Sequence, residues 1–369
     1  MRKKAEFYWG LFWQKTILGL GLLSLCVSGL ALFSGRLFPA RAAEGAALAA
    51  EGTGWEDSET AVPRRIPAAT EEGAEGLRPE EATPEATDPA QARAEAVTAV
   101  EEALAAADLA ALGDVEIQRR QLYTVDSRTT LLPGDIDPAA FLAMDMSLDP
   151  EAAGPQVLIF HTHSGEGYAD SDGSLEQGVY GLGERLKTLL EETYGIACLH
   201  CGERFDRVDG QSRITGAYER MEPVIAQILA ENPSIRVCID LHRDGVEPPV
   251  RLVTEQNGQT MAQLMLFNGL CRTLQNGQPV PAPGLSNPYL RENLALSFRL
   301  QTAGNALYPG LFRRTYLNAY RYSLHLRPLS LLVEVGAQTN TRAEALAAME
   351  PLARLLAGTL GENGRENEG

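Results

Sequence analysis

The sequence predicts an α/β protein with a mostly parallel sheet and helices on both faces, preceded by a transmembrane helix and a disordered linker. Short apolar runs such as Val157–Phe160 and Ile235–Leu241 are typical of strands buried on both faces. They alternate with stretches of helical spacing such as Gly181–Tyr194, which indicates strand–helix–strand units. A long uncharged run near the N-terminus supplies the membrane prediction.

The N-terminal region has the pattern of a membrane anchor. Basic residues within 1–15 precede the uncharged, Leu- and Gly-rich run 16–34, which is about long enough to cross a bilayer. The basic flank predicts that residues 1–15 lie in the cytoplasm and that the rest of the chain lies outside it, in a single-pass arrangement. Ala40–Ala42 has the small-x-small pattern of a signal peptidase site, so a cleaved signal peptide is the alternative.

Residues 35–93 are predicted to be a disordered acidic linker. They consist largely of Ala, Glu, Pro, Gly and Thr and hold too few large apolar residues to offset chain entropy. The whole chain has 49 acidic and 32 basic residues and a formal charge of -17. A chain of this charge would repel a phosphate backbone, so nucleic acid is not an expected partner. A short disordered tail is predicted at 363–369.

The ordered part is predicted to start with a small extension, residues 94–150. Ala94–Ala111 has the spacing of one short helix, and the strand-like stretch Glu116–Val125 and then Ile136–Leu148 follow it.

The main domain is predicted at residues 151–362 and begins with the strand Val157–Phe160. The further elements expected there are helix Gly181–Tyr194, strand Gly195–Leu199, helix Glu222–Glu231, strand Ile235–Leu241, helices Gln259–Gln275 and Pro288–Gly304, strand Leu329–Val335 and helix Thr341–Leu360.

The five cysteines are odd in number, and no disulfide framework follows from them. We expect mostly buried thiols. Cys198 and Cys201 have CxxC spacing, but a second pair of matching ligands is missing, so a strand end is favoured over a zinc knuckle.

Histidines and one glutamate stand where a ligand site is expected in an open α/β sheet, at the carboxyl ends of strands. His161 and His163 follow the first strand, His242 follows Ile235–Leu241, and Glu334 lies within the last strand. A catalytic zinc needs three N or O ligands and an open position for water. His163 and His242 with a glutamate form the simplest such set. Glu176 is favoured as that ligand because it opens the next helix.

Several alternatives stay open at this site. Glu166 is the other possible glutamate ligand, and it could instead shape the turn or bind substrate. His161 is interpreted as facing away from His163, where it would support the site or the core. Arg243 could orient the His242 imidazole or simply make a turn.

Glu334 is an acid in an otherwise apolar strand. Burial penalises the charged carboxylate and raises its pKa, so Glu334 is the candidate general base beside metal-activated water. The plainer interpretation is a buried glutamate paired with Arg243 or Arg313.

Four motifs together resemble the stage II sporulation protein P family of endospore-forming bacteria. They occur in the family's order within a match from about Gln121 to Leu360: HTHSGEGY at His161–Tyr168, DLHRDG at Asp240–Gly245, YPGLFRR at Tyr308–Arg314 and LVEVGAQTN at Leu332–Asn340. The catalytic part is also similar to the wider zinc amidase fold. His163, Glu176, His242 and Glu334 fall at the site positions of that fold, although the amidase Gly-rich turn is replaced by His161–Ser164.

This resemblance implies a membrane-anchored, zinc-dependent N-acetylmuramoyl-L-alanine amidase with peptide cross-link endopeptidase activity. It would act on septal peptidoglycan in the intermembrane space during forespore engulfment, with the stage II sporulation proteins D and M as partners. Two other functions remain possible from the sequence: a catalytically silent wall-binding scaffold, and a metal-dependent carbohydrate deacetylase. The oligomeric state, and the balance of amidase and endopeptidase activity, have no signature in the sequence.

Overall fold

The computed structural model describes residues 88–361. The predicted transmembrane run, nearly all of the predicted linker and the C-terminal tail lie outside these residues. Within 88–361, no helix has both the length and the apolar character needed to cross a membrane.

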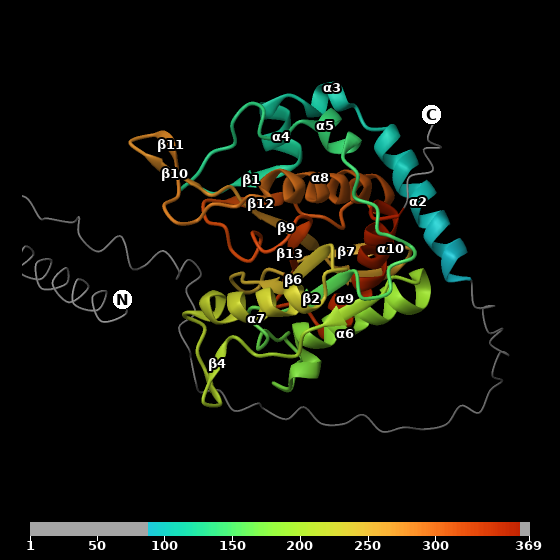
Figure 1. Cartoon of the computed structure of the whole chain (residues 1–369), viewed down its shortest axis with the longest axis vertical. Helices are drawn as coiled ribbons and strands as arrows, with labels where there is room; N and C mark the ends of the chain where they lie inside the picture. The colour runs from blue at the N-terminus through green and yellow to red at the C-terminus, as the bar shows by residue number, and fades with distance from the viewer. Residues whose placement is uncertain (1–87, 362–369) are drawn as a thin grey trace, which may run out of the picture. The chain divides into compact units, whose positions relative to one another are not determined.

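A seven-stranded sheet organises the described part of the chain (Figure 1). The strand order is β1-β12-β9-β13-β6-β2-β3. Their bounds are β1 Tyr123–Val125, β2 Val157–Phe160, β3 Cys198–His200, β6 Val237–Asp244, β9 Leu264–Gly269, β12 Thr315–Asn318 and β13 Ser330–Ala337. Strands β13, β6, β2 and β3 run parallel, as do β1, β12 and β9, and the two groups meet at the antiparallel pair β13–β9. The predicted mostly parallel sheet is confirmed.

Helices cover both faces of the sheet, as predicted. Helices α6 (Val179–Thr188), α8 (Leu290–Leu307) and α10 (Met349–Thr359) pack in the larger core cluster with Ile159 and Ile239. Helix α7 (Ala217–Glu231) packs on the other face against Leu158, Phe160 and Cys238. Successive strand side chains point to opposite faces, so β2 contributes to both cores.

The predicted helix Gln259–Gln275 is wrong. The chain there forms β8 (Gln259–Ala262), β9 and β10 (Arg272–Gln275), and two hairpins pair β7 (Val253–Gln256) with β8 and β10 with β11 (Gln278–Pro281). The hairpin turns are Asn257-Gly258, with φ of 53° and 80°, and Asn276-Gly277, with φ of 51° and 76°. An Asn-Gly pair adopts such positive angles readily and reverses the chain between strands. The Asn-Gly turns therefore favour hairpins here, although the spacing of the apolar residues would suit a helix.

The strand-like interpretation of Glu116–Val125 is also mostly wrong. Helix α4 (Val115–Gln121) precedes β1, and α5 (Pro138–Ala143) lies within Ile136–Leu148. Aspartates cap both helices: the Asp114 side chain accepts from two backbone N–H groups, and the Asp137 side chain accepts from one. Because β1 pairs with β12, this region is part of the main sheet.

Helix boundaries differ at both ends of the domain. Helix α2 (Pro89–Ala105) starts inside the predicted linker, where the Asp88 side chain caps it, and a short α3 (Leu109–Leu112) follows. The predicted last helix is divided into α9 (Arg342–Ala347) and α10. The remaining short elements are η1 (Leu175–Gln177), the π-helix η2 (Leu189–Thr193), β4 (Arg207–Val208) and β5 (Gln211–Ser212).

The cysteines of the described residues are free, and Cys198, Cys201 and Cys238 are buried as expected. Cys198 belongs to the core cluster on the α6 face, and Cys201 belongs to the one on the α7 face. Because these two side chains pack in different cores, the CxxC pair does not form a metal knuckle.

Candidate active site

The predicted residues after β2, in β6 and in β13 meet on one part of the sheet. The ring centroids of His163 and His242 are 5.4 Å apart, at an interplanar angle of 71°. Glu334 lies directly opposite His242 in the register of β13 with β6. The parallel strands β2, β6 and β13 bring these side chains together because equivalent ends of parallel strands lie at one edge.

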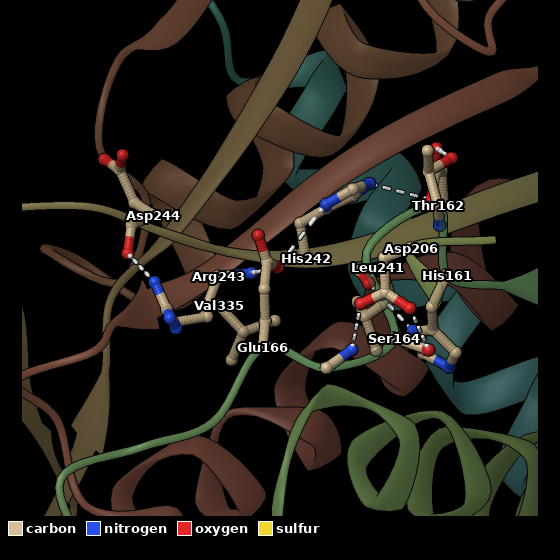
Figure 2. Close-up of polar contacts among 12 residues, drawn as sticks. His161, Thr162, Ser164, Glu166, Asp206, Leu241, His242, Arg243, Asp244 and Val335 are labelled. Atoms are coloured by element: carbon tan, nitrogen blue, oxygen red, sulfur yellow. Dashed lines mark hydrogen bonds and ion pairs between the residues drawn. The ribbon is translucent and has the colours of Figure 1, made fainter. Parts of the chain in front are cut away.

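Hydrogen bonds hold the turn from Ser164 to Glu166, which directly follows His163 (Figure 2). The buried Asp206 carboxylate accepts from the Ser164 hydroxyl at 2.8 Å and from the Gly165 N–H at 2.6 Å. The Glu166 Oε2 atom accepts from the Arg243 backbone N–H at 2.9 Å and lies 3.4 Å from His242 Nδ1. Glu166 is therefore in direct reach of the imidazole pair.

Glu176 lies elsewhere in this structure. It is exposed on the short η1 turn, and its backbone carbonyl accepts from Arg342 Nε at 3.3 Å. Within residues 88–361, no ion pair or hydrogen bond joins its carboxylate to His163 or His242. The structure thus brings Glu166, the alternative ligand, to the two imidazoles, and leaves the favoured Glu176 at the surface.

Two carboxylates hold His242 from opposite sides. Asp240 Oδ1 lies 2.8 Å from His242 Nε2 and forms a close ion pair with the imidazole. Burial disfavours a charged imidazole, but Asp240 and Glu166 outweigh it and raise the pKa of His242 well above its usual value. Burial alone would raise the pKa of Asp240, yet His242 and two hydrogen bonds from Thr162 lower it to about 2.

His163 has the opposite character. Burial, together with the neighbouring His242, lowers its pKa, so the ring stays neutral near neutral pH. Its Nδ1 atom is buried and makes no hydrogen bond within the described part of the chain. A neutral imidazole with an unused buried nitrogen is the form in which histidine binds metals.

Glu334 is a buried carboxyl of raised pKa in this site. Burial raises its pKa to about 8, since the opposing effect of His242 is smaller and further carboxylates add to the rise. Its Oε2 atom is buried without a hydrogen-bond partner. The plainer interpretation was that an arginine pairs with Glu334. Arg313 forms its ion pair with Asp244 instead, at 2.5 Å.

His161 faces away from the site. In a continuing strand His161 and His163 would share a face, but β2 ends at Phe160 and the chain turns directly after His161, so the two rings separate. Its ring lies near Tyr180 of α6, whereas the His163 ring lies near Tyr218 of α7. His161 Nδ1 donates to the Leu241 carbonyl at 2.8 Å, and its Nε2 lies 2.8 Å from His200 Nε2. We name His161 and His200 the histidine pair. Through His161 it holds the β6 backbone at Leu241, next to His242.

Arg243 supports the turn rather than the imidazole of His242. Besides its N–H bond to Glu166, its Nε atom donates to the Gly167 carbonyl at 2.7 Å. It thereby positions the carboxylate that contacts His242.

The donor atoms fit zinc in kind. Two imidazoles and a carboxylate are its usual catalytic ligands, and the unused Nδ1 of His163 points to a missing partner. Within residues 88–361, however, no three His, Cys, Asp or Glu side chains already converge as a metal site.

Sequence reasoning missed three residues that shape this site: Asp240, Asp206 and Tyr218. Asp240 was detectable, because it lies two residues before His242 in one strand and so faces the same side. Asp206 and Tyr218 come from the loop after β3 and from α7, and the sequence holds no signal for their approach.

This combination of an α/β sheet with paired imidazoles, a nearby carboxylate and a carboxyl of raised pKa is typical of hydrolases that activate water. Comparison with known families is more specific: the sequence model of "Stage II sporulation protein P (SpoIIP)" matches residues 43–357. The chain belongs to this family, as its four motifs predicted. No curated protein sequence matches the chain.

Several solved structures are similar to part of the chain. N-acetylmuramoyl-L-alanine amidase AmiC2 of Nostoc punctiforme is 17% identical, and the match covers 57% of this chain and 97% of that one, with a TM-score of 0.34. The N-acetylmuramyl-L-alanine amidase Ami1 from Mycobacterium smegmatis is 13% identical. The match covers 58% of this chain and 98% of that one, with a TM-score of 0.34. The CwlD amidase from Clostridioides difficile, in complex with the GerS lipoprotein, is 11% identical. The match covers 55% of this chain and 98% of that one, with a TM-score of 0.34.

Proposed function

We propose that the chain is a zinc-dependent peptidoglycan hydrolase that cleaves the amide bond between N-acetylmuramic acid and L-alanine, with endopeptidase activity on peptide cross-links. The observation that carries this proposal is the meeting of His163, His242 and Glu166 beside the buried carboxyl of Glu334. The choice of peptidoglycan as substrate rests on membership of the stage II sporulation protein P family.

His163, His242 and Glu166 are the residues that would hold the metal, with Glu176 as the alternative to Glu166. Zn²⁺ in such a set supplies a Lewis acid for the scissile carbonyl and lowers the pKa of water to about 7. Asp240 favours a proton on Nε2 of His242, so loss of the other proton, from Nδ1 on the Glu166 side, would free the Nδ1 lone pair for the metal. Glu166 is in turn oriented by the Arg243 N–H.

Glu334 is the residue that moves the proton. Its pKa of about 8 lies close to neutral pH, where a carboxyl can both accept a proton from attacking water and return it. The proton goes next to the leaving nitrogen of the amide, so that the stem peptide departs with a neutral amine. A carboxylate of ordinary pKa would be a weaker base toward the attacking water.

The proposed cellular setting rests on the family and on the N-terminal sequence. The run 16–34 would anchor the chain in the membrane, and the linker would hold the enzyme in the septal space outside the cytoplasm. The stage II sporulation proteins D and M are the proposed partners during engulfment.

Release of stem peptides from purified wall tests the activity. The full chain should liberate peptides with a new N-terminal L-alanine, lose this activity in chelator and regain it with zinc. His242→Ala should abolish release, while His325→Ala, a histidine paired with Glu222 outside the site, should retain it. Clearing of wall by both variants, or release of acetate instead of peptide, would refute the amidase assignment.

Metal content separates the two glutamates. Glu166→Gln should lower the zinc bound per chain, because a neutral amide is a much poorer zinc ligand, whereas Glu176→Gln should keep it. The reverse pattern would return the ligand role to Glu176.

A further inference from the structure

We propose that Tyr218, Tyr322, Phe267 and Tyr316 form a binding surface for the neutral sugar chain of peptidoglycan, leading away from the metal-binding residues. We name these four residues the aromatic row. The inference rests on the proposed function for the nature of the substrate, and it adds how the polymer is held.

The row is continuous with the active site. The His163 and Tyr218 ring centroids are 5.7 Å apart, and the Tyr218 and Tyr322 centroids are 5.6 Å apart. Tyr322 lies 4.7 Å from Phe267, and Phe267 lies 5.3 Å from Tyr316 in a stacked arrangement. Each ring is within ordinary aromatic contact distance of the next, so a ligand on the row would reach the imidazole of His163.

The sheet register explains why the row is accessible. Phe160, Asp240, Leu332, Phe267 and Tyr316 are successive cross-strand neighbours, so their side chains share one face. Helix α7 packs over the Phe160 end of that line. At the other end, Phe267 and Tyr316 stay only half-buried. A half-buried aromatic surface beside an active site is what a binding site for a partly apolar ligand requires.

Backbone strain at Tyr322 is independent support. Its φ is 52°, a left-handed conformation that is unfavourable for a bulky residue. The strained loop places the Tyr322 ring between Tyr218 and Phe267, where it closes the row. Strain of this kind persists where the surrounding structure requires it, and it gathers at ligand-binding sites.

The charges beside the row favour a neutral ligand. Arg128 stacks over Tyr320 and forms two hydrogen bonds to Asp126, at 2.7 and 3.0 Å, while the Tyr316 hydroxyl donates to the same carboxylate. Arg313 is paired with Asp244.

The two parts of peptidoglycan differ in charge in a way that suits this pairing. A stem peptide carries free carboxylates and would have to compete for these arginines. The lactyl carboxyl of the sugar chain is consumed in the amide bond, so the chain is neutral and offers apolar ring faces with hydroxyl edges. The aromatic rings of the row suit the apolar faces of the sugars, and the already paired charged groups beside the row suit a ligand without charge.

Binding of a soluble β-1,4-linked N-acetylglucosamine oligosaccharide to the full chain tests the proposal. The measurement is made in chelator, so that it does not depend on turnover. Tyr316→Ala and Tyr322→Ala should each weaken the affinity about tenfold, the loss expected for one aromatic contact. Tyr316→Phe keeps the ring and should stay close to the unmodified chain. Tyr194 is another half-buried tyrosine, placed between η2 and β3 and not part of the row. The control variant Tyr194→Ala should therefore bind the oligosaccharide normally.

The outcomes are separable from those for the amidase activity. Equal oligosaccharide affinity in folded Tyr316→Ala, Tyr322→Ala and Tyr194→Ala would overturn the proposal, as would weakening confined to a soluble stem peptide. Oligosaccharide binding that depends on the row, in a chain that releases no peptide from wall, would support the row and refute the amidase. Circular dichroism of each variant shows whether it is folded.

Discussion

The raised pKa of Glu334 predicts that this one carboxyl limits the stability of the metal-free protein at alkaline pH. Its folded-state pKa of about 8 stands against an ordinary value of 4.5. Below pH 4.5 the carboxyl is protonated in both states, and its stabilising effect is complete. As the pH rises from 4.5 to 8, the unfolded chain ionises but the folded chain does not, so the free energy of unfolding falls.

The size of the effect follows from that difference. An interval of about 3.5 pH units at about 1.36 kcal/mol for each unit corresponds to an upper limit of about 5 kcal/mol. Water penetration around the carboxyl reduces such penalties, so a measured loss of about 2 to 5 kcal/mol is expected. This is a large part of the ~5–15 kcal/mol stability of a typical domain.

The perturbation is Glu334→Gln, which replaces the carboxyl with a neutral group of the same shape. In chelator, urea unfolding of the unmodified chain should give a free energy that falls between pH 5 and pH 8, and the variant should lose most of that slope. The free energy of unfolding of Glu334→Gln should therefore exceed that of the unmodified chain by more and more as the pH approaches 8. Glu192→Gln removes a charge from an exposed glutamate and should follow the unmodified chain. Parallel pH profiles for Glu334→Gln and the unmodified chain would refute the reasoning.

Three further predictions concern the groups that support the site. Asp240→Asn removes the carboxylate that orients His242, so zinc affinity measured by chelator competition should fall roughly 10–100-fold; an unchanged affinity would exclude this role. Gly183→Ala would place a Cβ within 2.6–2.7 Å of the facing nitrogens of the histidine pair, and thermal unfolding should show a loss of about 1–3 kcal/mol unless the pair can separate freely. Asp206→Ala leaves the turn that carries His163 without its acceptor, and it should cost about 1–3 kcal/mol in urea; a stability equal to that of the unmodified chain would contradict the proposed support.

The strands that carry the site were predictable because their signal is local. Val157–Phe160 is an uninterrupted apolar run and appears as β2 with the predicted bounds. The last strand was predicted within a few residues of β13 for the same reason. Buried strands need apolar side chains on both faces, so they can be recognised from their own residues.

The failures have a different cause. Gln259–Gln275 has apolar residues at intervals that suit a helix, but Asn-Gly turns at both ends and pairing with β13 decide for strands. Periodicity describes one segment, whereas strand pairing is an interaction between segments. Glu116–Val125 failed in a related way, because the Asp114 cap starts a helix that the apolar pattern does not reveal.

The sequence by itself determined the class of fold and the family, and it singled out His163, His242 and Glu334 as candidate site residues, because strand composition and short motifs are local properties of the chain. Tertiary structure alone decided that Glu166 rather than Glu176 contacts His242, that Asp240 clamps the same ring, and that four aromatic residues line up beside it. Contacts of this second kind join residues distant in the chain, and they depend on strand order, register and loop conformation, which no single segment specifies.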